Sequence, residues 1–273
     1  MINVVDRVPT YPNRIKVTKS DGTSEYVTWE RADEPTVPGT PINKALFDSI
    51  VEDIGLNKNT TLYVSTAGSD SLGDGSAANP YATITKALNS LPKNLNGYDA
   101  LINIAAGAYA EDVDIHRFSG GNVSFIGSTD AAVSLRSLRV SFGAMVRIEK
   151  IALSLTGSIN DYAISVTNAN IACLSPVKII GSAPNGVYLN TSALCYFSSL
   201  EINNTTVNAI HATHNSSVYV ASFSGTNNTG IGIRSMGGAK VAYSVSTLSA
   251  ATTTLALAGG RIYAGAQTSI PNY

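Results

Sequence analysis

Residues 163–230 decide the fold, and they read AISVTNANIACLSPVKIIGSAPN, GVYLNTSALCYFSSLEINNTTVN and AIHATHNSSVYVASFSGTNNTG. Each of the first two units is 23 residues long, and Ile164, Val187 and Ile210 occupy the same place in successive units. Short apolar runs in each unit are separated by Asn, Gly, Ser and Thr. A repeat of this length, with short strands and polar corners, is typical of one coil of a parallel β-helix.

The repeat predicts which side chains stack inside, because residues at equivalent places in successive coils face the same way. Two inward ladders are expected, and their members are Ile164, Val187 and Ile210 in one and Val177, Leu200 and Phe223 in the other. The corners are rich in Asn, which suits tight turns because Asn tolerates left-handed backbone, although glycan hydrogen bonding is an alternative use. These corner residues are Asn168, Asn190, Asn203, Asn204, Asn215, Asn227 and Asn228.

An amphipathic helix is predicted before the coils. Tyr63 and Val64 have the pattern of a short strand, and residues 67–79 are rich in Gly, Ser and Asp, which indicates turns. An apolar stripe at i, i+3, i+4 and i+7 then predicts a helix of about three turns, which Pro92 ends. The stripe consists of Ile84, Ala87, Leu88 and Leu91.

The fragments YVS, GSD, GDGS, NP, ATI and AL between Leu62 and Leu91 resemble the opening segment of right-handed parallel β-helix proteins. That group includes pectate-lyase-like folds and many phage tailspikes, in which an amphipathic helix covers the first open coil. The resemblance implies an all-β fold, a right-handed parallel β-helix of about seven coils with an N-terminal capping α-helix. Such a helix would hide the apolar cross-section and the unpaired backbone groups of the open end.

Charge divides the chain into a front module and a β array. Sixteen charged residues lie between Met1 and Lys58, whereas only five lie between Tyr162 and Tyr273. The expected domains are an attachment module at 1–60, the opening strand and capping helix at 61–97, and the parallel β-helix at 98–273.

The attachment module is predicted to contain a β-hairpin and a helix. Apolar and polar residues alternate on either side of Asp21-Gly22, which indicates a hairpin with a two-residue turn. A hairpin alone is marginally stable, so a partner surface is expected to bind it. The attachment residues are Tyr11, Ile15, Val17, Tyr26 and Trp29. The helix, from Pro41 to about Ile54, carries an apolar stripe that either lies on its own domain or forms an oligomer seam. The stripe residues are Ile42, Leu46 and Ile50.

Two front segments, VVDRVPTYPNRIKV (Val4 to Val17) and ERADEPTVPGTPINKALF (Glu30 to Phe47), resemble the N-terminal segments of phage and prophage tail and fibre proteins from Gram-positive hosts. The resemblance implies a virion protein, assembled in the bacterial cytoplasm, whose front joins another virion protein. It also implies a homotrimer. Whether the location is the tail, the baseplate or the capsid stays open.

Composition argues against several classes of partner. The formal net charge is −1 and the pI is about 6.3, so no basic field favours nucleic acid or an anionic membrane. The sequence contains no run of 18 apolar residues, so no membrane-spanning helix is predicted. Cys173 and Cys195 are interpreted as buried small hydrophobes rather than a disulfide or a zinc site, and no cofactor is expected.

Candidate catalytic residues are few. Glycan cleavage needs two carboxylates, or a base with a cation, and from Tyr162 onward the coils contain only Glu201. The segment AEDVDIH offers weak candidates, of which Asp112, Asp114 and His116 would share one face of a strand while Val113 and Ile115 point inward. A solvated strand face explains the same pattern. Two further residues, His211 and His214, could bind a metal only if they shared a face, which their i, i+3 spacing disfavours, so no metal is expected.

The leading hypothesis is a non-enzymatic virion fibre or spike. The alternatives are a tailspike depolymerase that cleaves surface polysaccharide, a capsid head fibre or decoration protein, and a bacterial surface adhesin. Polar groups and scattered Tyr on the coils would suit weak contacts to a host surface glycan, with an inert polar rod as the alternative. The Tyr residues concerned are Tyr188, Tyr196, Tyr219, Tyr243 and Tyr263.

Overall fold

The chain forms two units, Met1–Ile54 and Gly55–Tyr273. The computed structural model describes residues 14–18, 22–28, 55–128, 133–143, 145–155, 160–173 and 176–264. In the first unit, β1 (Arg14–Thr18) pairs antiparallel with β2 (Ser24–Thr28), which confirms the hairpin. The predicted two-residue turn is wrong: the ladder stops where Thr18 faces Ser24, so residues 19–23 connect the strands. The described residues do not include the predicted attachment and seam residues Tyr11, Trp29, Ile42, Leu46 and Ile50. For Ile15, Val17 and Tyr26 the side chains are not described.

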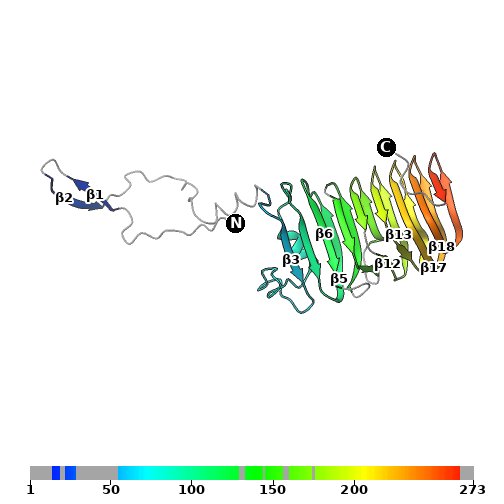
Figure 1. Ribbon diagram of the computed structural model, residues 1–273, viewed down its shortest axis with the longest axis horizontal. Coiled ribbons are helices and arrows are strands. Elements are labelled where there is room, and N and C mark those ends of the chain that lie inside the picture. The colour runs from blue at the N-terminus through cyan, green and yellow to red at the C-terminus, as the bar shows by residue number, and fades with distance from the viewer. Residues whose placement is uncertain are drawn as a thin grey trace. The chain divides into compact units, whose positions relative to one another are not determined.

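The second unit is a parallel β-solenoid of about seven turns, with strands stacked from β3 to β19 (Figure 1). Each turn runs through three faces in a constant order. The first face consists of β3 (Thr60–Val64), β4 (Ala100–Ile104), β6 (Asn122–Gly127), β8 (Met145–Glu149), β11 (Asn170–Cys173), β14 (Leu194–Phe197), the starts of β17 (Ser217–Met236) and β18 (Lys240–Leu257), and β19 (Arg261–Ala264).

The other two faces follow within each turn. The second face consists of the starts of β5 (Gly107–His116) and β7 (Val133–Ser141), then β9 (Ala152–Leu153), β12 (Val177–Ile179), β15 (Leu200–Ile202) and the middles of β17 and β18. The third face consists of the ends of β5 and β7, then β10 (Tyr162–Thr167), β13 (Ala183–Asn190), β16 (Thr205–Ala212) and the ends of β17 and β18.

Both predicted inward ladders are confirmed. Ile164 lies beside Val187 and Val187 beside Ile210 in parallel register on the third face, and all three are fully buried. On the second face the same holds for Val177, Leu200 and Phe223. Burying one such side chain contributes about 1.5–3 kcal/mol, and each member of a ladder adds its own contribution.

The predicted helix is present but shorter than expected. Helix α2 (Ile84–Asn89) has six residues, with Thr83 as its N-cap, and it ends before Pro92 because proline disfavours helical backbone in the residue that precedes it. Its apolar side chains join the core of the coils, and they are Ile84, Ala87 and Leu88. That α2 covers the open end of the solenoid stays a prediction. In the described part of the chain, no helix is long and apolar enough to cross a membrane.

The Asn-rich corners adopt left-handed backbone only in part. Four have φ between 49° and 61°, namely Asn168, Asn204, Asn215 and Asn227. The other three, Asn190, Asn203 and Asn228, do not. Asn203 and Asn228 instead accept hydrogen bonds from backbone N–H groups of the neighbouring turn, which fixes the side chain rather than the turn conformation.

Candidate functional site

The acidic segment lies on β5, and its alternate side chains divide between core and surface as predicted. Val113 and Ile115 are buried, whereas Asp114 and His116 are about half exposed. Asp114 Oδ1 lies 3.7 Å from His116 Nδ1. The structure therefore brings together two of the three candidate residues.

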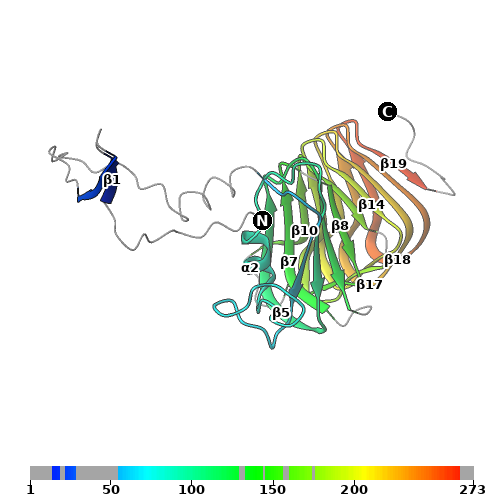
Figure 2. The same ribbon diagram turned by 60° about the vertical axis from the view of Figure 1, so that its left-hand side comes forward.

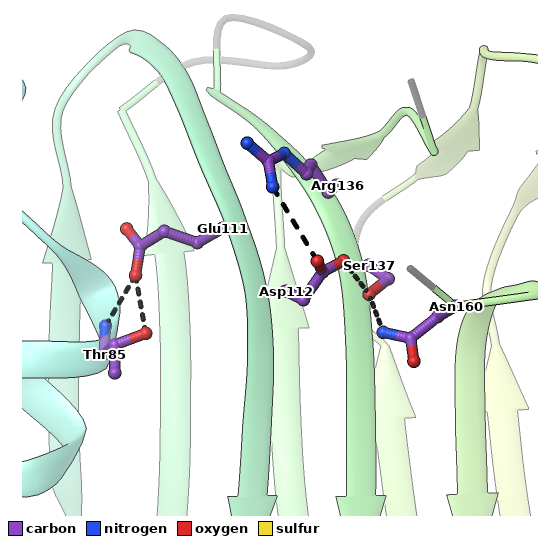
Figure 3. Close-up of polar contacts among 6 residues, drawn as sticks. All are labelled: Thr85, Glu111, Asp112, Arg136, Ser137 and Asn160. Carbon is purple, nitrogen blue, oxygen red and sulfur yellow. Dashed lines mark hydrogen bonds and ion pairs between the residues drawn. The ribbon is translucent and has the colours of Figure 1, made fainter. Parts of the chain in front are cut away.

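The third candidate, Asp112, is held at the corner between the second and third faces. Ser137 of the next turn donates a hydrogen bond to Asp112 Oδ1 at 2.6 Å, and Asn160 Nδ2 donates to Ser137 Oγ at 2.8 Å (Figure 3). Arg136 Nη1 lies 3.9 Å from Asp112 Oδ2. These hydrogen bonds link neighbouring turns, and Ser137 is buried, so water does not compete for them. Asp112 therefore has a structural role.

Glu111 binds the start of α2. Its Oε1 accepts a hydrogen bond from Ile84 N at 2.9 Å. Its Oε2 accepts from Thr85 N at 2.9 Å and from Thr85 Oγ1 at 2.7 Å (Figure 3). These N–H groups have no partner within the helix, and a carboxylate also suits the positive end of the helix dipole. Sequence reasoning missed this role because Glu111 and α2 are brought together only by the coil.

Glu201 is also engaged. Its Oε2 lies 3.1 Å from Lys178 Nζ on the adjacent turn, and its Oε1 accepts a hydrogen bond from Asn203 Nδ2 at 3.0 Å. The hydrogen bond from Asn203 and the ammonium of Lys178 lower the pKa of Glu201. Glycosidases need two carboxylates that flank one bond, and Glu111, Asp112 and Glu201 each bond to a different part of the scaffold.

The two histidines belong to different local structures, because only His211 is in a strand. His211 is on β16, whereas His214 is in the following turn with φ +50°, and its Nδ1 lies 3.0 Å from Thr213 Oγ1. Burial and the neighbouring Arg234 lower the pKa of His211. Among the described residues, no group of three His, Cys, Asp or Glu could hold a metal ion.

The cysteine prediction is confirmed for the one thiol that is described. Cys195 is fully buried in the core, and burial raises the pKa of its thiol far above the ordinary range. The side chain of Cys173 lies outside the described part of the chain. A buried neutral thiol packs as a small hydrophobe.

Tyrosine rings on successive turns of the solenoid stack on one another. Tyr196 and Tyr219 stack on each other with centroids 5.4 Å apart, and Tyr162 and Tyr188 stack at 4.5 Å. Tyr219 is buried, with its Oη 2.8 Å from Ser244 Oγ. Rings on successive turns stack face to face, and this stacking contributes to the stability of the coil.

A pocket of about 410 Å³ lies near the first turns of the solenoid. It follows the corner between the first and second faces, and a loop that precedes α2 forms one wall. Figure 2 shows this loop projecting beside α2 and β5. The lining includes Tyr63, Ser65, Pro80, Asn103, Ser128 and Lys150.

The loop that forms this wall is tightly bonded. Tyr63 N donates to Gly75 O at 2.8 Å, and Ser69 N donates to Pro80 O at 3.0 Å. A Cβ at Gly73 would lie 2.5 Å from Pro80 O, so the chain passes where only glycine fits. Asp70 closes the loop, because it accepts hydrogen bonds from Ala82 N at 2.8 Å and from Thr83 N at 3.0 Å.

Acid is expected to loosen this loop. Partial burial raises the pKa of Asp70, but hydrogen bonds from Thr83 and Ala82 outweigh it and lower the pKa overall. A carboxylate whose folded-state pKa is lowered stabilises the fold above its unfolded pKa, and that stability is lost as pH falls through the folded pKa. Asp70→Asn should therefore reduce hydrogen-exchange protection of residues 66–83 at neutral pH and flatten its dependence below about pH 4.

Asp74→Asn is the control within the same loop. Asp74 is exposed and accepts a hydrogen bond within its local turn, from Ser76 N at 2.9 Å, so its replacement should leave protection of residues 66–83 nearly unchanged. Equal protection in the wild type and in Asp70→Asn, after correction for intrinsic exchange rates, would contradict the role given to Asp70.

The function has to be argued from the residues and the fold of this chain. Comparison with models of known protein families, with curated proteins and with solved structures finds no match to it.

Proposed function

We propose that the chain is a non-enzymatic structural protein of a phage particle, a fibre or spike that joins the particle through residues 1–60. The resemblance of Val4–Val17 and Glu30–Phe47 to phage tail and fibre proteins supports this proposal. The parallel β-solenoid is compatible with it, because phage tailspikes are among the proteins that the opening segment resembles.

The observation that carries the proposal is that three carboxylates of the solenoid bond to the scaffold itself. Glu111 caps α2, Asp112 bonds to the next turn through Ser137, and Glu201 pairs with Lys178. These groups stabilise a stacked scaffold, which is what a fibre or spike requires. Function follows from sites rather than from folds, so this use of polar groups weighs more than the solenoid itself.

The partners are part of the proposal. The front module would bind another virion protein through the hairpin, and three copies would associate along the stripe of Ile42, Leu46 and Ile50. The solenoid would contact a host surface glycan, and a trimer would multiply weak contacts through effective concentration.

Removal of the front module tests the role in attachment. The deletion should end at Ile54, because Leu56 belongs to the solenoid core and donates from its N to Asn94 O at 3.0 Å. Residues 55–273 are expected to keep the far-ultraviolet spectrum of a β protein and to be missing from purified particles, in which the full chain is present. Incorporation of the deleted chain would contradict attachment through the front, and a strictly monomeric full chain in light scattering would contradict the trimer.

A second candidate is a polysaccharide-cleaving tailspike, and the exposed pair of Asp114 and His116 is the observation that favours it. Release of reducing sugar from host polysaccharide, lost in Asp114→Asn but not in Asp74→Asn, would select this candidate over the structural one.

A further inference from the structure

The corner between the first and second faces is hollow at the start of the solenoid. Ala105 N donates to Val64 O and Ser128 N donates to Ile104 O, each at 2.9 Å, so the corner residues of successive turns stack in register. Ser65, Ala105 and Ser128 lie along this stack and line the pocket. Because their side chains are small, they leave the space that the neighbouring loop then walls off.

The walls of the hollow are formed before any ligand arrives. Tyr63 and Ile126 lie on the first face, while Ala77 and Pro80 come from the loop that Asp70 closes. A site whose wall is already ordered loses little conformational entropy on binding. Its volume of about 410 Å³ lies near the lower end of the roughly 300–1,000 Å³ typical of small-molecule sites.

One cation lies at this hollow without a counter-ion among the described residues. Lys150 is the charged residue of the lining, and it makes no ion pair with any described residue. The adjacent carboxylate of Glu149 is bound by Arg147. The backbone of Lys150 is left-handed, with φ +57°, and its carbonyl oxygen packs so closely on Gly127 that a Cβ there would lie 2.2 Å from it.

The remaining polar groups are neutral. Asn103 offers an amide, and Ser65 and Ser128 offer hydroxyls, all of which hydrogen-bond to hydroxyl groups. Tyr63, Pro80 and Ile126 add apolar surface, which suits the C–H face of a sugar ring. A ligand that matches all three features is a small polyhydroxylated ring that carries one negative charge.

We propose that this pocket binds an anionic saccharide unit, with the ammonium of Lys150 on its carboxylate or phosphate group. A uronic acid and a sugar phosphate share this chemistry, and the probes below distinguish them. The site deepens the glycan contact proposed above and rests on it. The two proposals fail separately, because saccharide binding is measured on the isolated full chain, whereas attachment is measured by incorporation of residues 55–273 into particles.

Binding of D-glucuronic acid, D-glucose 6-phosphate and neutral methyl α-D-glucoside would be measured by ligand-observed NMR and calorimetry on the full chain. At least one anionic probe should bind about tenfold more tightly than the neutral glucoside, because a charge-assisted hydrogen bond adds about that factor. The preferred probe identifies the carboxylate or the phosphate as the natural group.

Lys150→Met removes the charge and keeps the unbranched stem of the side chain. It should weaken binding of the anionic probe about tenfold and leave binding of the neutral probe unchanged. Lys58→Met, at an exposed lysine away from the lining, is the matched control and should bind normally. Ser128→Tyr fills the hollow from an exposed corner and should abolish binding of every probe while the unfolding temperature stays near that of the wild type.

Three results would overturn the proposal. One is a lack of binding by either anionic probe at 10 mM or so, a concentration that detects even weak sites. Another is equal affinity for the anionic and neutral probes. The third is unchanged affinity in Lys150→Met or in folded Ser128→Tyr, because the ligand would then bind elsewhere.

Discussion

Phe223→Ala is expected to lower the free energy of unfolding of the solenoid by about 3–5 kcal/mol. Phe223 is 1% exposed and lies beside Leu200 in the inward ladder of the second face. Alanine would leave a cavity between turns, and close packing above and below would allow little of it to collapse. The loss should appear as a lower urea midpoint in far-ultraviolet circular dichroism.

Tyr196→Ala is the control on a neighbouring face. Tyr196 is 38% exposed and its ring stacks on Tyr219, so removal of the ring should cost only about 1 kcal/mol. We expect the solenoid to unfold as one unit, so the slope of the unfolding free energy against urea concentration should be similar in both variants. A solenoid that unfolded in separate segments would show a shallower slope. A loss in Phe223→Ala no larger than that in Tyr196→Ala would contradict the assignment of Phe223 to the core.

The inward ladders could be predicted because the repeat is regular where they lie. Ile164, Val187 and Ile210 are separated by 23 residues, and the register places them side by side. A residue whose equivalent in every turn is apolar has to face the core, since its neighbours in the strand alternate outward. Sequence alone therefore determines this part of the structure.

The environment of the acidic residues could not be predicted, because the turns differ in length. Asp112 pairs with Ser137, 25 residues later, whereas Ile233 pairs with Thr254, only 21 residues later. Partners across turns cannot be named until each offset is known. For the same reason the sequence did not predict the bond from α2 to Glu111 or the hollow beside Lys150. The hollow exists only once the loop before α2 is folded.

The Asn-rich corners contain a second feature that a turn preference does not predict. Asn203-Asn204-Thr205 stacks on Thr226-Asn227-Asn228 of the next turn, and the two segments bond reciprocally. Asn203 Oδ1 accepts from Thr226 N at 2.8 Å and from Thr226 Oγ1 at 3.1 Å. Asn228 Oδ1 accepts from Thr205 N at 3.0 Å and from Thr205 Oγ1 at 2.7 Å. The bonds are equivalent, but the first pair is exposed and the second is buried.

Asn228→Ala is therefore expected to lower the free energy of unfolding by about 2–4 kcal/mol, and Asn203→Ala by only about 1 kcal/mol. Asn228 is 4% exposed, and its Nδ2 also donates to Ile202 O at 2.9 Å, so alanine would leave buried polar groups without partners. Water can replace the lost bonds at Asn203, whereas it cannot reach Thr205, which is fully buried. Urea unfolding of both variants measures the difference. Equal losses in the two variants would mean that burial adds nothing to the strength of these bonds.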